Sequence, residues 1–456
     1  MTIDGESETA ADPLAARSLA LAVLLQVEKE TAHADVALAV ALGASGLPTR
    51  DRALASRLVY GTLAWQGRLD WQIARFIDRD LTSFDPHVRI ALRLGLYQLT
   101  LLDRVPDHAA VATSVELAKR HVPAAAGLVN AVLRRTIRER DRLPLPDPAG
   151  DPLEHLAITL SHPRWLVEPW QARFGSAGVA ELLRADNEAA PTVLRARPGT
   201  RDTLLARLAE AGVPCEPGRF APDAIRVQAA DPHSIAGWSA GEFSVQEEAS
   251  QIVVHLLAAE PGMRVLDTCA APGGKATYLA DLMGDRGTVV ALDHRARGVR
   301  AVATNADRLR LASIAPRVLD ARTVDTTLPH ASFDRILVDA PCSGLGTLRA
   351  HPEIRWRREP HDLVRLGEQQ RQMLAAATPL LKPGGVIVYA TCTLSDEENE
   401  DVVRAWLAAH PELEREDARA HLPASAHALV DDTGALCTLP HRDDLDGFYA
   451  VRARRR

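Results

Sequence analysis

The feature that most constrains the fold is a repeated alternation of short apolar stretches and longer amphipathic segments in the second half of the chain. Residues 263–269, 287–293, 316–321, 333–341 and 384–392 are predicted as strands, and helical patterns separate most of them. Repeated strand–helix units form a parallel sheet that binds ligands at the carboxyl ends of its strands. We therefore expect a doubly wound α/β domain over residues 244–456, closed by a C-terminal hairpin.

The preceding residues follow other patterns. Residues 14–142 are rich in Ala and Leu, with apolar positions three and four apart, which predicts an all-helical domain. Residues 143–152 contain four prolines and a glycine and are predicted to be a linker. Residues 153–243 begin with a helical stretch and continue as strand, helix and strand, so a small α+β domain is expected there. A length of 456 residues also favours several domains.

Composition narrows the class of protein. The chain is 46% hydrophobic and 25% charged, which is typical of soluble globular proteins, and no apolar run approaches the roughly 20 residues of a membrane span. The acidic, polar start, residues 1–13, lacks the pattern of a signal peptide and is expected to be a disordered tail. Because the net charge is −7, any surface for nucleic acid must be local.

The cysteines are scattered, and none forms a CxxC pair. This argues against a disulfide framework and against a metal site, and it favours a reducing cytoplasm as the location. The five are Cys215, Cys269, Cys342, Cys392 and Cys437.

Two of these thiols are predicted to lie at the tips of neighbouring strands. Cys342 follows the fourth strand and Cys392 ends the fifth, so both could reach one pocket. Free cysteines are usually just buried, but two thiols at strand ends beside Asp339 favour covalent chemistry. A helix expected to begin near Ser395 would place its positive end near Cys392 and favour the thiolate.

Acidic side chains at successive strand ends suggest a ligand site. Asp267, Asp293, Asp320 and Asp339 end the first four predicted strands, and the glycine turn "CAAPGGK" at 269–275 follows the first. Such a turn brings backbone N–H groups and a helix N-terminus to a ligand. Asp293 could hold a ribose and Asp320 an adenine amino group. These features predict an adenosine-containing cofactor. S-adenosylmethionine and a nicotinamide dinucleotide both remain open, although the absence of GxGxxG favours the former.

Basic residues supply further candidates. Lysine occurs at only four positions, and Lys275 lies in the glycine turn, either by chance or because a compact ammonium is needed there. Arginines cluster at the end of the helical segment and in "LRAHPEIRWRREP", directly after the Cys342 turn. Both clusters are either solvated surfaces or contacts for RNA phosphates and bases. The candidates for RNA contact are Arg134, Arg135, Arg138, Arg349, Arg355, Trp356 and Arg357.

Several motifs resemble those of a known family. "LDTCAAPGGKATYLA", "VDAPCSGLGTLRAHPEIRW" and "YATCTLSDEEN" are similar to the motifs of RNA cytosine-5 methyltransferases, and the Pro-Cys and Thr-Cys pair is specific to that class. "GLVNAVLRR" and the helical start resemble the NusB-like extension of the bacterial RsmB (Sun/Fmu) family, which modifies small-subunit ribosomal RNA. The resemblance covers almost the whole chain. Two departures are Glu247, where the family often has Gln-Asp, and Asp396, where Pro is common.

The resemblance implies an all-helical NusB-like domain, a small α+β domain and a Rossmann-like methyltransferase domain. It implies that Cys392 is the nucleophile that adds to C6 of cytosine, that Cys342 helps to release the product, and that Asp339 contacts the target base. Lys275 is expected to help orient the pocket. The residues implied for S-adenosylmethionine are Cys269, Ala270, Ala271, Pro272, Gly273, Gly274, Lys275, Asp293, Asp320 and Asp339.

The expected function is therefore methylation of C5 of a cytosine in 16S ribosomal RNA by a cytoplasmic monomer without a membrane partner. A tRNA enzyme of the same chemistry is disfavoured by the NusB-like extension. A non-catalytic RNA-binding assembly factor would not need both thiols. A Rossmann dehydrogenase is disfavoured because GxGxxG is missing.

Overall fold

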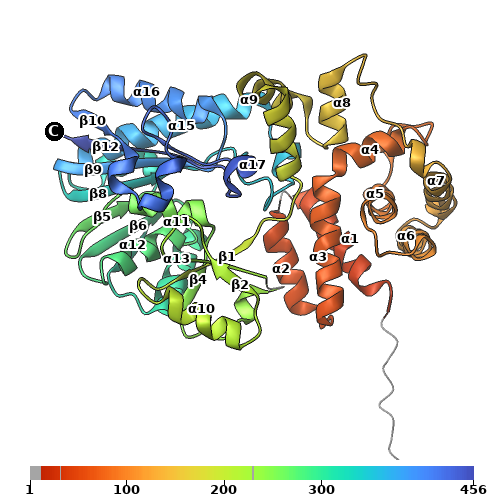
Figure 1. The fold of residues 1–456 in the computed structure, drawn as a ribbon, viewed down its shortest axis with the longest axis horizontal. Helices are drawn as coiled ribbons and strands as arrows, with labels where there is room; N and C mark the ends of the chain where they lie inside the picture. The colour runs from red at the N-terminus through yellow and green to blue at the C-terminus, as the bar shows by residue number, and fades with distance from the viewer. Residues whose placement is uncertain (1–11, 31, 229–230) are drawn as a thin grey trace, which may run out of the picture. The chain divides into compact units, whose positions relative to one another are not determined.

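The computed structural model describes residues 12–30, 32–228 and 231–456, and the chain divides into two compact units (Figure 1). The helical unit extends to Glu188 and also contains Leu348–Arg357. The sheet unit consists of Ala189–Thr347 and Arg358–Arg456. The expected disordered tail falls mainly on residues 1–11, which lie outside the described residues.

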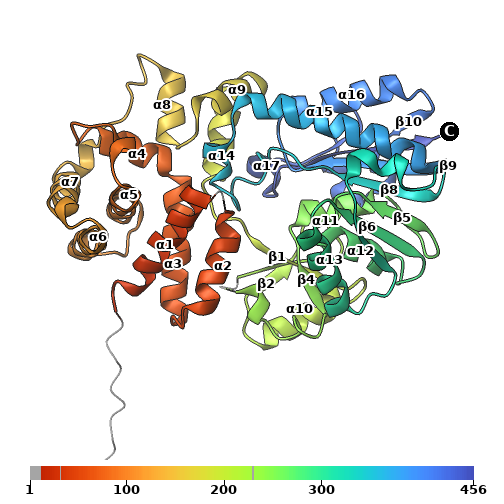
Figure 2. The same cartoon turned by 180° about the vertical axis from the view of Figure 1, so that it is seen from behind.

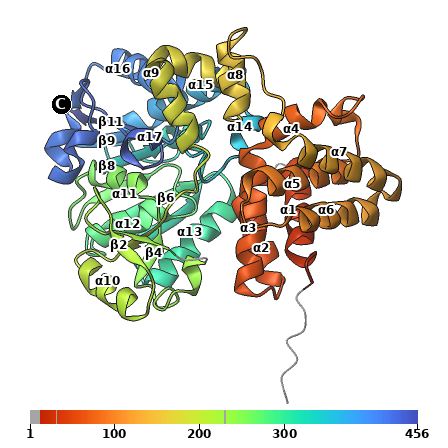
Figure 3. The ribbon, with the colours of Figure 1, turned by 45° about the vertical axis from the view of Figure 1, so that its right-hand side comes forward.

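The helical unit is built around one helix that is buried along most of its length. Helix α5 buries almost every side chain from Val88 to Leu99, and Figure 3 shows it among the other helices of the unit. Asp85 caps α5 by accepting a hydrogen bond from the His87 N–H, and Pro86 occupies its first turn. The helices are α1 (Ala15–Glu30), α2 (Ala34–Ala44), α3 (Thr49–Ala64), α4 (Gln66–Ala74), α5 (Pro86–Leu101), α6 (Asp107–His121), α7 (Ala126–Arg138), α8 (Pro152–Thr159), α9 (Arg164–Ala185) and α14 (Ile354–Arg357).

The sheet unit begins with a small antiparallel sheet. Its strands are β1 (Thr192–Ala196), β2 (Cys215–Pro217), β3 (Ala224–Val227) and β4 (Phe243–Val245), in the order β2-β3-β1-β4, and α10 (Arg201–Glu210) connects β1 to β2. The strand, helix and strand predicted for this region are confirmed.

A larger sheet forms the rest of this unit. Its strands are β5 (Arg264–Asp267), β6 (Thr288–Asp293), β7 (Ile314–Val318), β8 (Phe333–Asp339), β9 (Leu381–Thr391), β10 (Leu413–Glu416), β11 (Leu436–Cys437) and β12 (Tyr449–Arg455). The order is β10-β12-β9-β8-β5-β6-β7, and β11 pairs with β12 in the expected hairpin. Strands β5 to β9 are mutually parallel, but β12 is antiparallel to β9 and to β10. The sheet is thus mixed, because a closing hairpin reverses the chain direction.

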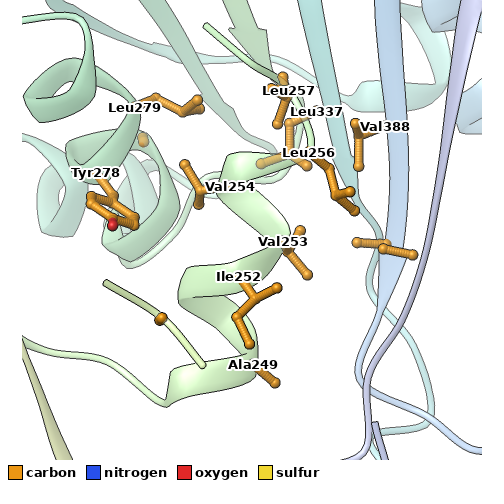
Figure 4. Packing of buried hydrophobic residues seen from close by; sticks show 14 of the residues in the cluster. Ala249, Ile252, Val253, Val254, Leu256, Leu257, Tyr278, Leu279, Leu337 and Val388 are labelled. Carbon is orange, nitrogen blue, oxygen red and sulfur yellow. The ribbon is translucent and has the colours of Figure 1, made fainter. Parts of the chain in front are cut away.

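Helices cover both faces of this sheet (Figure 2). Along β8, Leu337 points to the face covered by α11 (Glu248–His255), α12 (Gly274–Leu282) and α13 (Ala296–Leu309), whereas Ile336 and Val338 point to α15 (Pro360–Ala377) and α16 (Glu400–Ala409). This alternation follows from the two-residue period of a strand. Figure 4 shows Leu337 and Val388 with apolar side chains of α11, such as Val253. A short helix, α17 (Pro440–Asp443), lies in the connection between β11 and β12.

Two predicted boundaries were wrong. The third strand ends at Val318, so Asp320 lies two residues beyond it, at the cap of the 3-10 helix Ala321–Thr326. The α-helix expected near Ser395 begins at Glu400, after a 3-10 turn at Asp396–Glu398. No helix among the described residues is both long enough and apolar enough to cross a membrane.

Candidate active site

The two strand-end cysteines lie together in the sheet unit. Cys342 follows β8, and Cys392 directly follows β9, which pairs in parallel with β8 up to Asp339 and Ala390. The Sγ atoms of Cys342 and Cys392 are 3.3 Å apart, and the Cys392 N–H donates to the Cys342 Sγ at 3.4 Å. The parallel register therefore brings both thiols to one point at the carboxyl edge of the sheet.

Buried hydrogen bonds hold the two cysteine loops in this position. The hydroxyls of Ser343 and Thr393, each next to one of the cysteines, are 2.7 Å apart. Glu398, which is fully buried, accepts from the Ser343 N–H at 2.8 Å and from Gln370 Nε2 at 3.0 Å. Glu398 lies in the motif "YATCTLSDEEN", but nothing in the sequence pattern indicated a role for it. Its two donors connect the loop that carries Cys342 to α15 through one buried carboxylate oxygen.

A lysine supplies positive charge beside the thiols. Lys275 Nζ donates to Asp339 Oδ2 at 2.7 Å. Burial alone would lower the pKa of Lys275, but Asp339, followed by Cys392 and Asp267, outweighs burial and raises it. Lys275 therefore remains an ammonium within electrostatic reach of Cys392. Because α16 begins only at Glu400, this ammonium is a better source of thiolate stabilisation than the helix end that the sequence suggested.

The pKa of Cys342 is raised well above its usual range. The hydrogen bond with Cys392 is the largest cause, followed by burial and by the negative charges of Cys392 and Glu398. The raised pKa favours the protonated form of Cys342 at neutral pH, which makes Cys342 a poor nucleophile and leaves Cys392 as the candidate.

The predicted glycine turn connects β5 to α12. Gly273 has a φ of 111°, which favours glycine, and an added Cβ would lie 3.2 Å from Val302 Cα. The Ala270 N–H donates to the Leu292 carbonyl of β6 at 2.7 Å, and Asn305 Nδ2 donates to the Pro272 carbonyl at 2.9 Å. These contacts fix a bend that points the N-terminus of α12 toward the carboxyl edge of the sheet.

One residue that fixes this turn was missed by the sequence analysis. Arg195 on β1 is 1% exposed and donates to the Gly274 carbonyl at 2.6 Å and to Thr277 Oγ1 at 3.1 Å. It also donates to Gln246 and lies 3.6 Å from Asp281. The only signal in the sequence was a charged residue within an apolar strand, "TVLRA". The small antiparallel sheet thus contributes a buried cation beneath the predicted cofactor loop.

The strand-end carboxylates Asp267 and Asp293 and the nearby Asp320 differ in their surroundings. Asp267 is 1% exposed, and its Oδ2 has no hydrogen-bond partner among the described residues. Burial and the neighbouring Asp339 raise the pKa of Asp267 to about 7. Asp293 Oδ1 accepts from the Arg295 N–H at 2.7 Å. Asp320 pairs with Arg322 at 2.6 Å, and that hydrogen bond lowers the pKa of Asp320.

This arrangement fits S-adenosylmethionine. The unpartnered oxygen of Asp267 is an acceptor for an amino group, and Asp293 ends the second strand, where a ribose is bound in related nucleotide folds. The N-terminus of α12 suits a carboxylate. An amino acid joined to a nucleoside has all three groups.

The arginines predicted to contact RNA fall into two classes. Arg134, Arg135 and Arg138 are exposed on α7, opposite its buried apolar face. Arg134 donates to Asn130 Oδ1 at 3.0 Å, and Arg135 pairs with Glu139 at 2.9 Å, so their contact with RNA phosphates stays a prediction.

The second group is largely buried in the helical unit, and for two of its members the prediction was wrong. Arg355 is completely buried and donates to the Asp186 carbonyl at 2.9 Å and to Asn187 Oδ1 at 2.7 Å, and Arg349 is only 8% exposed. Internal acceptors hold the guanidinium of Arg355, and the burial of both side chains argues against phosphate contact. The Trp356 Nε1 donates to the Leu63 carbonyl at 3.0 Å, and Trp356 and Arg357 line a cavity of about 670 Å³.

Comparisons with protein families match three successive regions. A model described as 16S rRNA methyltransferase RsmB/F matches residues 254–454, the NusB family matches residues 14–138, and an RsmF/B-like ferredoxin-like domain matches residues 162–233. These matches confirm the expected helical NusB-like, small α+β and Rossmann-like methyltransferase architecture.

Curated relatives match over nearly the whole chain. "Probable ribosomal RNA small subunit methyltransferase B" from Bacillus subtilis is 36% identical, covering 96% of this chain and 98% of the relative. Ribosomal RNA small subunit methyltransferase B from Thermus thermophilus is 38% identical, and the match covers 96% of this chain and 97% of the relative.

Solved structures have the same fold. The crystal structure of PH0851 has a TM-score of 0.84 at 25% identity and covers 97% of this chain and 99% of that one. NSun6 from Pyrococcus horikoshii, solved with SFG, has a TM-score of 0.57 at 20% identity, covering 64% of this chain and 98% of that one. At this identity the second likeness concerns the fold alone.

Proposed function

The chain belongs to the ribosomal RNA small subunit methyltransferase B family, and on this basis we propose that it methylates C5 of a cytosine in 16S ribosomal RNA with S-adenosylmethionine. The observation that carries the proposal is the pair of thiols at adjacent strand ends, 3.3 Å apart. One thiol is enough for nucleophilic addition. A second thiol in hydrogen-bond contact suits a reaction in which a covalent adduct must also be resolved.

The first step uses Cys392. C5 of cytosine is a weak nucleophile, and addition of the Cys392 thiolate to C6 makes it enamine-like. Lys275, held by Asp339, favours the thiolate by its charge. Asp339 is assigned to the N3 and amino edge of the base, where charge develops on addition. S-adenosylmethionine supplies the electrophilic methyl group when bound. The target base must leave the RNA stack to reach these side chains.

The last step uses Cys342. The C5 proton must leave before the C6–Sγ bond of Cys392 can break and the ring regain its double bond. Once Cys392 is a thioether it carries no charge, so the largest cause of the raised pKa of Cys342 is weakened, and Cys342 releases its own proton to solvent more readily. The Cys342 thiolate formed in this way then accepts the C5 proton. The contact between the thiols thus couples proton transfer to the progress of the reaction.

Methyl transfer to separated RNAs tests the proposal. The purified chain is incubated with S-adenosylmethionine carrying a labelled methyl group and with either 16S ribosomal RNA or tRNA, both lacking the modification. Bisulfite sequencing then locates any 5-methylcytosine. Label in a single cytosine of 16S RNA is expected. Label only in tRNA would favour the related tRNA chemistry, and RNA binding without transfer would indicate an assembly factor.

A further inference from the structure

A second group of polar side chains lies in the helical unit, outside the catalytic machinery. His33 precedes α2, while His351 and Glu353 precede α14. One nitrogen or oxygen atom of each lies within 4.8 Å of the other two. His33 Nδ1 is 3.6 Å from Glu353 Oε1. Two segments more than 300 positions apart thus bring two imidazoles and a carboxylate together.

The buried carboxylate of this group, Glu353, has too few hydrogen-bond and charge partners. Glu353 is 2% exposed, and its Oε1 accepts from the Ala34 N–H at 3.2 Å. Its Oε2 has no hydrogen-bond partner among the described residues, and neither has Nδ1 of His351. Among the described residues, His33 lies within ion-pair distance of Glu353, and the buried Arg355 also attracts this carboxylate at longer range. A buried carboxylate with an unpaired oxygen is costly unless a cation joins it.

The segment that carries His351 and Glu353 is firmly held. Arg355 satisfies internal carbonyl groups, the Trp356 Nε1 donates to the Leu63 carbonyl, and Arg357 Nη2 donates to the Val27 and Ala32 carbonyls at 2.6 and 2.7 Å. His33 makes no side-chain capping bond to α2, and its side chain is 61% exposed. Two ligands are therefore fixed by the scaffold, while the third is free to rotate and leaves a path for an ion.

We propose that His33, His351 and Glu353 form a binding site for one borderline divalent metal ion of the Zn²⁺ class. Two imidazoles and a carboxylate suit Zn²⁺ rather than Mg²⁺ or Ca²⁺, which prefer oxygen ligands. Tetrahedral ligands at about 2.0–2.2 Å from Zn²⁺ lie roughly 3.3–3.6 Å from one another. The 3.6 Å distance between His33 Nδ1 and Glu353 Oε1 already agrees with this spacing. Rotation of the His33 side chain can bring the remaining ligand atoms to the same spacing.

A water molecule is expected to supply the fourth ligand. Asp35 lies outside the group of three, and its Oδ1 is 3.9 Å from Nδ1 of His351. The bound ion joins the start of α2 to the residues before α14 and acts as a structural link inside the helical unit.

The cysteine pattern gave no sign of this site. The expectation of no metal site rested on the lack of a CxxC pair. The ligands here are histidine and glutamate, and no regular spacing connects position 33 with 351 and 353. Only the fold brings them together.

Zinc titration of the full chain, purified without a histidine tag and freed of metal with a chelator, tests the proposal. Calorimetry should show one Zn²⁺ per chain at micromolar or tighter affinity. His33→Ala, His351→Ala and Glu353→Gln should each weaken it by about tenfold or more. His33→Ala removes an exposed side chain and Glu353→Gln keeps the acceptor for Ala34, so folded variants are expected.

The matched control is His233→Ala, since His233 is also exposed, at 57%, and pairs with a carboxylate, Asp231. It should bind Zn²⁺ like the unchanged chain. Because the Cys342–Cys392 pair is another potential ligand, Co²⁺ absorption is recorded in parallel. Bands of nitrogen and oxygen ligands without a thiolate charge-transfer band support the proposal. Absence of binding, binding unchanged in His33→Ala and His351→Ala, or binding lost only in Cys392→Ser overturns it.

Discussion

The Sγ atoms of Cys342 and Cys392 lie 3.3 Å apart although the residues are fifty positions apart in the sequence. They meet because β8 and β9 are parallel neighbours whose loops leave the same edge of the sheet. The hydrogen bond with Cys392 is the largest cause of the raised pKa of Cys342. This contact supports the proposed order of the two thiols in the reaction, and the surrounding side chains can be tested one at a time.

Asp293→Ala should weaken the binding of S-adenosylhomocysteine by about 1–3 kcal/mol, because a charge-assisted hydrogen bond to the ribose is lost. Isothermal titration calorimetry measures this directly. Asp307→Ala, an exposed aspartate on α13, is the matched control and should bind normally. Equal affinity of both variants would remove Asp293 from the cofactor site.

Asp267 should make cofactor binding depend on pH. Its pKa is about 7 in the folded protein, against about 3.9 for an unfolded chain. The folded state therefore binds this proton more tightly, and the stability it contributes is present below about pH 4 and lost as pH rises through about 7. An amino group bound at Asp267 requires the carboxylate, so affinity for S-adenosylhomocysteine should rise between about pH 6 and 8.

Asp267→Asn should reduce this affinity and flatten its pH dependence. Titration of the ligand affects both proteins, so the difference between their curves isolates Asp267. If the two curves run parallel, Asp267 does not hold the amino group.

Arg195 is predicted to act as a positioning residue for the cofactor loop. Arg195→Met removes its hydrogen bonds to the Gly274 carbonyl and Thr277 and leaves Asp281 buried with less compensation. We expect a loss of roughly 3–5 kcal/mol in unfolding free energy and a higher KM for S-adenosylmethionine. Arg195→Lys should recover part of the lost unfolding free energy, but its KM should stay closer to that of Arg195→Met, since one ammonium cannot make all the hydrogen bonds of a guanidinium. If a variant has a lower unfolding free energy but an unchanged KM, Arg195 only stabilises the core and does not position the cofactor loop.

The exposed arginines of α7 should contribute to RNA affinity. Replacing Arg134, Arg135 and Arg138 together by Gln should reduce the salt dependence of binding by about 2–3 units in the log–log slope. Fluorescence anisotropy over a range of salt concentrations measures it. The control replaces three arginines of α15 and α16, which are the exposed Arg365 and Arg404 and the half-buried Arg371. An equal slope change in both triple variants would mean that net charge alone is responsible.

The regular parts of the fold and site were predictable from the sequence because they depend on local periodicity. The pattern of apolar residues predicted the alternation of strands and helices along the sheet unit. The positions of Asp267, Asp293 and Asp339 at strand ends followed from this alternation. The antiparallel pairing of β12 with β9 was not predictable, because β12 is inserted between β9 and β10 and its direction depends on these distant partners.

Residues whose role depends on distant partners were harder to identify. Arg355 looked like a surface charge in an arginine-rich segment, yet it is buried among carbonyl groups of residues some 170–190 positions earlier. Arg195 and Glu398 are likewise defined by contacts with loops that are far away in sequence. Neither the composition of the sequence nor the spacing of its residues identifies such partners.

The most direct test of the central claim is the separation of the two cysteines by alanine substitution. Each variant is incubated with substrate RNA and S-adenosylmethionine and examined by denaturing electrophoresis. Cys342→Ala should attack and methylate, then stall before elimination, leaving a protein–RNA adduct. Cys392→Ala should give neither adduct nor methyl transfer, because no thiolate attacks C6. An adduct with Cys392→Ala and none with Cys342→Ala would contradict the account and reverse the two roles.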